Sequence, residues 1–317
     1  MIDHSKDLLL ACQQAATPSE RATRALIFAD WLEDQGHSFD AGTVRLAVES
    51  GMDGFDAVLS VPSGGSGRAA GELKVMRLGD QDLRFRWCPP GSFTMGSPPD
   101  GPDGNYTEGL VSVRHTRGFW IGEVPVTQAV WVALYGTPEY WSTTKDGPRL
   151  PVNGVTHTCC VIFCDNLTNR LRESGELPVG WRLSLPTEAQ WEYACRAGTQ
   201  TRFPWGDDED RHGEYAWSGR NSEQRIHEVG LLRPNGWGIH DMLGNVHDWC
   251  MDAWFIKSIG GDDPVEKAEE PFIDPDYRVF RGGSFDSGEL GRPAARFSRH
   301  VGRLSENLGF RLVMVHE

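Results

Sequence analysis

Glycine and tryptophan are both frequent in this sequence, and together they restrict the folds open to it. The 317 residues include 37 glycines and 12 tryptophans. Glycine allows backbone turns that strain other residues, and large aromatic side chains anchor irregular segments when they are buried. A chain of this length forms one large domain or two smaller ones, and it can bury a substantial core. The composition therefore predicts a loop-rich fold held together by aromatic side chains.

The first 60 residues follow a helical pattern. In TPSERATRALIFADWLEDQGH, Thr17 is the expected N-cap, Pro18 lies in the first turn and Glu20 completes a capping box. Residues 60–71, SVPSGGSGRAAG, have the composition of a flexible linker. We therefore predict a helical domain over residues 1–60, a linker over 61–72 and a second domain over 73–317.

Short strands and glycine turns dominate the second domain. LKVMRL and LRFRW alternate apolar and polar residues around GDQD, which predicts a hairpin. Helices are expected over about residues 127–134, 158–172 and 187–198. The second helix is expected to bury Ile162 together with Leu167 and Leu171. The predicted fold class is α+β with much irregular structure.

Charge and cysteine content exclude several classes of protein. The net charge of −14 argues against a general nucleic-acid partner and against docking on an anionic membrane. Asp3 and Asp7 lie where a signal peptide needs positive charge, so we expect a cytoplasmic protein. The seven cysteines form no CxxC pair. Free buried thiols are favoured over a disulfide among Cys159, Cys160 and Cys164.

Seven motifs occur in order along the second domain: FTMGS (93–97), EVPVT (123–127), RLSLPTEAQWEYACRAG (182–198), FPWG (203–206), PNGWGIHDMLGNVHDWC (234–250), RVFRGGSF (278–285) and NLGFRL (307–312). Together they resemble the formylglycine-generating enzyme family, also called sulfatase-modifying factor domains. The resemblance covers about residues 80–317 and implies a compact, irregular fold related to C-type lectins. Near the N-terminus, ALIFADWLEDQG resembles a repeat-companion domain found mainly in planctomycete proteins, which implies a bacterial source and a domain boundary.

One departure from the family concerns its copper centre. The family's enzymes oxidise a sulfatase cysteine to an aldehyde with copper(I), held by two cysteines between a Gly-Gly-Ser motif and an Ala-Ala-Arg motif. Here that interval is Ser284–Arg296, SFDSGELGRPAAR, which has no cysteine. Copper(I) is soft and prefers sulfur ligands. Copper is therefore not expected, and no catalytic residue is assigned.

A second departure is His247, which stands where the family commonly has a tryptophan. His247 would need several convergent partners to bind a different metal, and the facing segment offers few. A polar residue in a surface pocket is the favoured interpretation.

The resemblance also implies a structural calcium ion in the turn DMLGNVHD. Its ligands in the family correspond to the side chains of Asp241 and Asp248 and the backbone carbonyls of Gly244 and Val246. Carboxylates together with carbonyl oxygens suit this hard cation. The alternative is that the two aspartates only cap the turn through backbone N–H groups.

The segment RGGSFDSGELGRPAARFS, residues 281–298, has glycines, hydroxyls and arginines but no cysteine or histidine. We expect it to be a recognition surface, formed by His247, Trp249, Arg281, Ser284, Phe285, Arg292 and Arg296. Because its arginines predict a positive spot in an acidic chain, the expected partner is a peptide or protein with an acidic group. In the alternative, Arg281 and Arg296 are structural and pair with acids such as Asp248 or Glu192.

Three functions fit these features. The favoured one is a non-catalytic ligand- or peptide-binding module. The second is a metal-dependent oxidase or modifying enzyme with a different metal centre, so whether the chain is an enzyme stays open. The third is a variable ligand-binding protein of a diversity-generating retroelement, since RLSENLGFRLV resembles the terminal GFR motif of such proteins.

Overall fold

The computed structural model describes residues 66–98, 105–136, 147–265, 276–288 and 291–317, and a few positions between residues 17 and 27. The chain divides into a small unit, chiefly Met1–Ser66, and a large unit made of Gly67–Leu177 and Trp181–Glu317.

The described positions of the small unit are mostly helical, and they include residues 19, 20, 22, 23 and 25–27. The Glu20 amide donates to Thr17 Oγ1 at 3.2 Å, as expected of an N-cap at Thr17. The rest of the predicted helical domain and most of the predicted linker lie outside the described residues, so these boundaries stay a prediction.

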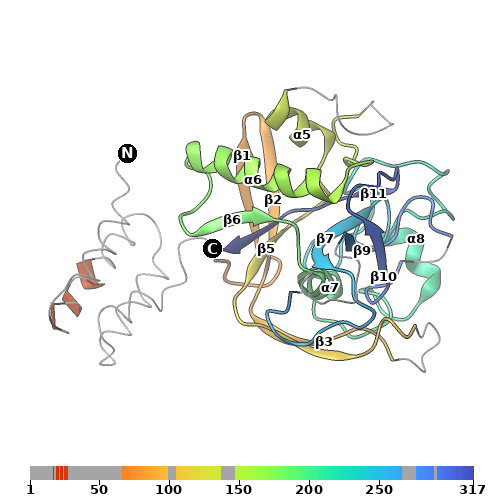
Figure 1. Ribbon diagram of the computed structural model, residues 1–317, viewed down its shortest axis with the longest axis horizontal. Coiled ribbons are helices and arrows are strands. Elements are labelled where there is room, and N and C mark those ends of the chain that lie inside the picture. The colour runs from red at the N-terminus through yellow and green to blue at the C-terminus, as the bar shows by residue number, and fades with distance from the viewer. Residues whose placement is uncertain are drawn as a thin grey trace. The chain divides into compact units, whose positions relative to one another are not determined.

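The large unit combines short strands with a few helices (Figure 1). Its strands are β1 (Leu73–Leu78), β2 (Gln81–Cys88), β3 (Gly91–Met95), β4 (Val111–His115), β5 (Phe119–Gly122), β6 (Trp181–Ser184), β7 (His247–Ala253), β8 (Gly261–Asp262), β9 (Tyr277–Arg281), β10 (Arg296–His300), β11 (Leu308–Gly309) and β12 (Val313–His316). Its helical segments are α5 (Gln128–Tyr135), α6 (His157–Glu173), α7 (Glu188–Arg196), the 3-10 turn η1 (Glu209–Arg211) and α8 (His212–Tyr215).

The strands form three small sheets. Their orders are β1-β2-β5-β12-β6, β10-β9-β7-β11 and β3-β4-β8. β1 and β2 pair antiparallel with Leu78 opposite Gln81, which confirms the predicted hairpin. The predicted α+β class with much irregular structure is confirmed.

Threonine N-caps begin the three longer helices of the large unit. The Oγ1 atoms of Thr127, Thr156 and Thr187 each accept from the backbone N–H three residues on. The Thr187 N–H donates to Gln190 Oε1 at 3.0 Å, which completes the predicted capping box.

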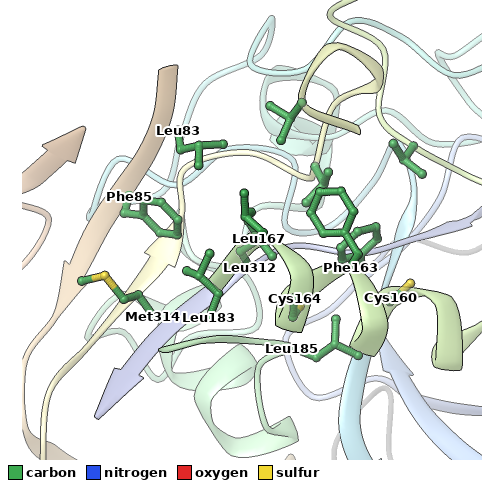
Figure 2. Packing of buried hydrophobic residues seen from close by; sticks show 14 of the residues in the cluster. Leu83, Phe85, Cys160, Phe163, Cys164, Leu167, Leu183, Leu185, Leu312 and Met314 are labelled. Atoms are coloured by element: carbon green, nitrogen blue, oxygen red, sulfur yellow. The ribbon is translucent and has the colours of Figure 1, made fainter. Parts of the chain in front are cut away.

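The main core lies between α6 and the five-stranded sheet. Figure 2 shows Phe163 and Leu167 of α6 packed among the side chains that include Leu183 and Leu312. The prediction that Ile162 is buried was wrong, because its side chain is 50% exposed. The buried face of α6 instead follows residues 160, 163, 164, 167 and 171, and residue 162 lies off that face.

Two further observations concern cysteines and membrane helices. The cysteines of the described part are free thiols, and all except the partly buried Cys159 are buried. Burial raises the pKa of the Cys250 thiol well above its ordinary value. A helix long and apolar enough to cross a membrane does not occur among the described residues.

Candidate functional site

A surface pocket of about 270 Å³ lies where the β9–β10 connection meets the start of β7. We call it the glycine pocket. It is lined by Asn105, Glu108, His247, Gly282, Gly283, Ser287, Gly288, Gly291, Arg292, Ala295, Arg296 and Phe297. The segment singled out in the sequence therefore supplies most of its wall.

Three glycines of this wall pack directly on the backbone of a neighbouring segment. A Cβ on Gly282 would lie 2.6 Å from the Met242 carbonyl oxygen, and Gly282 has a φ of +83°. A Cβ on Gly283 or Gly291 would lie 2.5 or 2.3 Å from the Leu243 carbonyl oxygen. Real Cβ atoms do not approach so closely, so only glycine fits. The wall of the glycine pocket therefore packs against the turn that carries Asp241 and Asp248.

Arg281 is a structural residue and does not line the pocket. Its side chain is fully buried and pairs with Glu192, and its Nη1 lies 3.2 Å from Glu188 Oε1. The same guanidinium donates to the carbonyls of Pro293 at 2.7 Å and Ala294 at 3.2 Å. The ligand role predicted for Arg281 was wrong, and the alternative of a buried pair with Glu192 holds.

The other two arginines reach the pocket but are also paired. Arg296 donates to both carboxylate oxygens of Glu188, at 2.6 and 2.8 Å. Arg292 makes the same two-pronged contact with Glu108, at 2.9 and 3.1 Å. Because each guanidinium faces a carboxylate, these side chains do not form the positive spot that the sequence predicted.

Hydroxyl groups surround His247 at the inner end of the pocket. Its Nε2 lies 3.1 Å from Ser284 Oγ, which in turn lies 2.7 Å from Ser287 Oγ. The Ser284 hydroxyl also donates to Asp286 Oδ1 at 2.7 Å. Burial lowers the pKa of His247 to about 4, so the imidazole is neutral at pH 7. Ser284 is buried and does not line the pocket. His247 and Ser287 are the members of this network that line it.

Two predicted ligand residues lie elsewhere. Trp249 is fully buried in the main core, where its Nε1 donates to the Val155 carbonyl at 3.1 Å. Phe285 does not line the glycine pocket, and its backbone N–H donates to the Asn245 carbonyl at 2.8 Å. The sequence interpretation missed Glu108 and Phe297, which do line it. Glu108 lies 184 residues from its partner Arg292, and no local pattern connects two such positions.

The turn predicted to hold calcium has a tightly fixed backbone. Asp241 and Asn245 both adopt left-handed conformations, with φ of 55° and 68°. A Cβ on Gly244 would lie 2.2 Å from the Trp217 carbonyl oxygen. The Asn245 side chain holds the backbone of His227 through two hydrogen bonds of 3.0 Å. The carbonyl groups of this turn are therefore held in place before any ion binds.

The two aspartates of the turn each leave one buried oxygen unpaired. Asp241 Oδ2 accepts from the Gly230 N–H at 2.7 Å. Asp248 Oδ2 accepts from Trp191 Nε1 at 2.9 Å and from Arg311 Nε at 2.6 Å. Neither Oδ1 has a hydrogen-bond partner among the described residues. A buried carboxylate oxygen without a donor is destabilising, and a cation would satisfy both atoms.

The two carboxylates of the turn repel each other weakly. Burial raises the pKa of Asp241, the Gly230 N–H and the Arg311 guanidinium oppose this rise, and the Asp248 carboxylate adds a smaller one. A bound cation would relieve this repulsion. The two unpaired Oδ1 atoms are compatible with the calcium ion that the resemblance implies, and Gly244 and Val246 stay predicted carbonyl ligands. No cluster of three or more His, Cys, Asp or Glu side chains suited to a metal occurs within the described ranges.

The fold and pocket define a loop-rich, C-type-lectin-like scaffold with a surface pocket. The chain belongs to the family of the sulfatase-modifying factor enzyme 1-like domain, whose model matches residues 83–315. A formylglycine-generating enzyme of Streptomyces coelicolor is 40% identical over 204 residues, which are 57% of this chain and 59% of that protein. The inactive C-alpha-formylglycine-generating enzyme 2 of Bos taurus is 25% identical over 294 residues, 74% of this chain and 90% of that protein.

Two solved structures share the fold. PvdO from Pseudomonas aeruginosa aligns with a TM-score of 0.66 at 23% identity and covers 78% of this chain and 99% of its own. Treponema denticola variable protein 1 aligns with a TM-score of 0.64 at 24% identity. The alignment covers 76% of this chain and 98% of that protein. The chain spans 39% to 59% of the length of the first four curated relatives that it matches.

Proposed function

We propose that this protein is a non-catalytic module that binds a peptide or protein segment in the glycine pocket. The observation that carries the proposal is the composition of the pocket wall. Where the family's enzymes hold copper between two cysteines, the interval Ser284–Arg296 presents hydroxyls and paired arginines and has no thiol. The nearest preceding cysteine, Cys250, is fully buried in the core. Soft copper(I) would find no sulfur ligand on this wall.

The chemistry of the pocket also supports binding rather than catalysis. Its arginines are held by Glu108 and Glu188, so they shape the wall and do not act as free charges. His247 is a weak base because its pKa lies at about 4, well below neutral pH. The inactive relative from Bos taurus shows by its name that the family includes members without the aldehyde-forming activity.

The ligand that suits this pocket is a short peptide segment. A volume of about 270 Å³ admits one or two side chains, and it is smaller than that of most pockets for organic ligands. Phe297 is 40% exposed at the rim and offers apolar contact area. An acidic group on the ligand is not required, since Glu108 already occupies the guanidinium of Arg292.

Filling the pocket should abolish binding without unfolding the domain. A Cβ on Gly288 would meet no atom within 4 Å, so Gly288→Phe adds a ring over the pocket without a clash at Cβ. Peptides selected by phage display on the wild-type protein should lose at least tenfold in affinity for this variant, measured by fluorescence polarisation. Gly302→Phe is the matched control, because its Cβ makes only ordinary contacts and it does not line the pocket. Peptides that bind both variants as well as wild type would place the binding site elsewhere.

The enzymatic alternative has its own test. Incubation of a cysteine-containing sulfatase peptide with the protein, copper and oxygen should leave the thiol intact in mass spectrometry. The reason is the missing pair of sulfur ligands between Ser284 and Arg296. Aldehyde that forms only when both this protein and oxygen are present would overturn the non-catalytic assignment.

The retroelement hypothesis remains a second form of the same binding function. The similarity to the Treponema denticola variable protein concerns the fold. A reverse-transcriptase gene next to this one, with a template copy of the 3′ coding region, would establish that hypothesis.

The free cysteines of the described part suit the cytoplasmic location predicted from the sequence.

A further inference from the structure

A second pocket, of about 500 Å³, lies at one edge of the five-stranded sheet. We call it the sheet-edge pocket. The β4–β5 turn, β6, the first turn of α7 and the end of β12 all contribute to it. It shares no lining residue with the glycine pocket. Its volume is typical of sites that bind small organic molecules.

Two arginines of the sheet-edge pocket have no ion-pair partner in the described part of the chain. Arg117 and Arg182 are exposed, and neither guanidinium makes an ion pair or hydrogen bond with the residues that the structure describes. In the glycine pocket, by contrast, Arg292 and Arg296 both face glutamates. Two arginines without a described acidic partner thus line one pocket of a chain whose net charge is −14. Guanidinium groups bind carboxylate and phosphate oxygens in a fixed two-pronged geometry.

The only acid that lines the sheet-edge pocket within the described ranges does not neutralise these arginines. It is Asp263, whose Oδ1 accepts from the Thr116 N–H at 2.9 Å and whose other oxygen accepts from the Thr116 hydroxyl. Burial and the Arg117 cation together lower the pKa of His316, which also lines this pocket. Among the described lining residues, two arginines thus stand against one carboxylate.

Further donors come from the start of α7. In the capping box, Thr187 and Gln190 accept bonds from each other's backbone N–H groups through their side-chain oxygens. The Thr187 hydroxyl hydrogen and the Gln190 amide hydrogens have no acceptor in the described part of the chain, and both residues line the pocket. The lining also includes the partly exposed apolar side chains of Met251 and Val315.

We propose that the sheet-edge pocket binds a small organic anion with an apolar body. Arg117 and Arg182 hold its carboxylate or phosphate group, the Thr187 and Gln190 donors complete the contacts, and the apolar body lies against Met251 and Val315. This site is separate from peptide binding in the glycine pocket and does not depend on it.

Isothermal titration with three probes tests the proposal: 4-phenylbutyrate, phenyl phosphate and the neutral 4-phenylbutyramide. At least one of the two anions should bind the wild-type protein, and the amide should bind at least tenfold more weakly than the tighter-binding anion or not at all. Whichever anion binds more tightly identifies the head group as carboxylate or phosphate. Arg117→Gln and Arg182→Gln should each weaken anion binding at least tenfold.

Arg170→Gln is the matched control, because Arg170 is an exposed arginine on α6 outside the pocket. It should bind the anions as wild type does, and so should the Gly288→Phe variant of the glycine pocket. The proposal is overturned if neither anion binds, if the amide binds as well as the tighter-binding anion, or if either arginine variant retains wild-type affinity.

Discussion

Arg281→Met should lower the free energy of unfolding by about 3–5 kcal/mol, the usual effect of removing one partner from a buried ion pair. Arg281 is fully buried, and its removal would leave the carboxylates of Glu188 and Glu192 with less positive charge. Glu192 would keep Arg196 at 2.8 Å, and Glu188 would keep Arg296, so the network would be weakened and not erased. Urea unfolding at 25 °C measures the change.

A double variant and an exposed control make this result specific. Glu192→Gln combined with Arg281→Met should be less stable than Arg281→Met alone, because the buried Arg196 would then lose its carboxylate partner as well. Arg220→Met removes an exposed partner of Glu209 and should leave the urea midpoint unchanged. If Arg281→Met unfolds at the wild-type midpoint but loses peptide binding, then Arg281 acts on the ligand and the structural assignment fails.

Local features of this fold were readable from the sequence because they depend on neighbouring residues. Thr187 and Gln190 form their capping box across three positions, and the hairpin of β1 and β2 follows the alternation around GDQD. The order of family motifs likewise led to the right scaffold. The exposed Ile162 shows the limit of such patterns, since three apolar residues at approximate helical spacing do not fix which face meets the core.

The candidate site was only partly readable, because its partners come from distant parts of the chain. The arginines of segment 281–298 are evident in the sequence. Their pairing, Arg292 with Glu108 and Arg296 with Glu188, could not be predicted from it. An arginine next to glycines can face solvent or brace buried backbone, and only the position of its partner acid decides. The charge of a pocket therefore cannot be inferred from the basic residues of one segment.

Calcium should raise the melting temperature of the protein, and a chelator should lower it. The buried Oδ1 atoms of Asp241 and Asp248 have no hydrogen-bond partner among the described residues, so an ion bound there would satisfy both. An ion that binds only the folded state stabilises it by about 2.7 kcal/mol at a hundred times its dissociation constant. For a domain of this size that corresponds to roughly 5–10 °C. Differential scanning calorimetry with calcium and with EDTA measures the difference.

Asp241→Asn is the informative variant for this test, because it removes a proposed ligand without breaking an ion pair. Asp248→Asn would also take away the carboxylate that pairs with the buried Arg311, so its stability would fall for a second reason. Asp241→Asn should lose most of the difference between calcium and EDTA, whereas Asp262→Asn, at an exposed carboxylate, should keep it. A wild-type protein whose melting temperature is the same in calcium and in EDTA would contradict the calcium site.

The position of this turn extends the same prediction to the glycine pocket. Gly282 packs on the Met242 carbonyl, and Gly283 and Gly291 pack on the Leu243 carbonyl, so a change in the turn moves the wall of the pocket. EDTA should therefore weaken peptide binding in the wild-type protein, and calcium should restore it. In Asp241→Asn, binding should respond to neither. Because the sheet-edge pocket shares no lining residue with the glycine pocket, its affinity for organic anions should stay the same in EDTA. Loss of both binding activities in EDTA would mean that the whole domain loosens when calcium is removed.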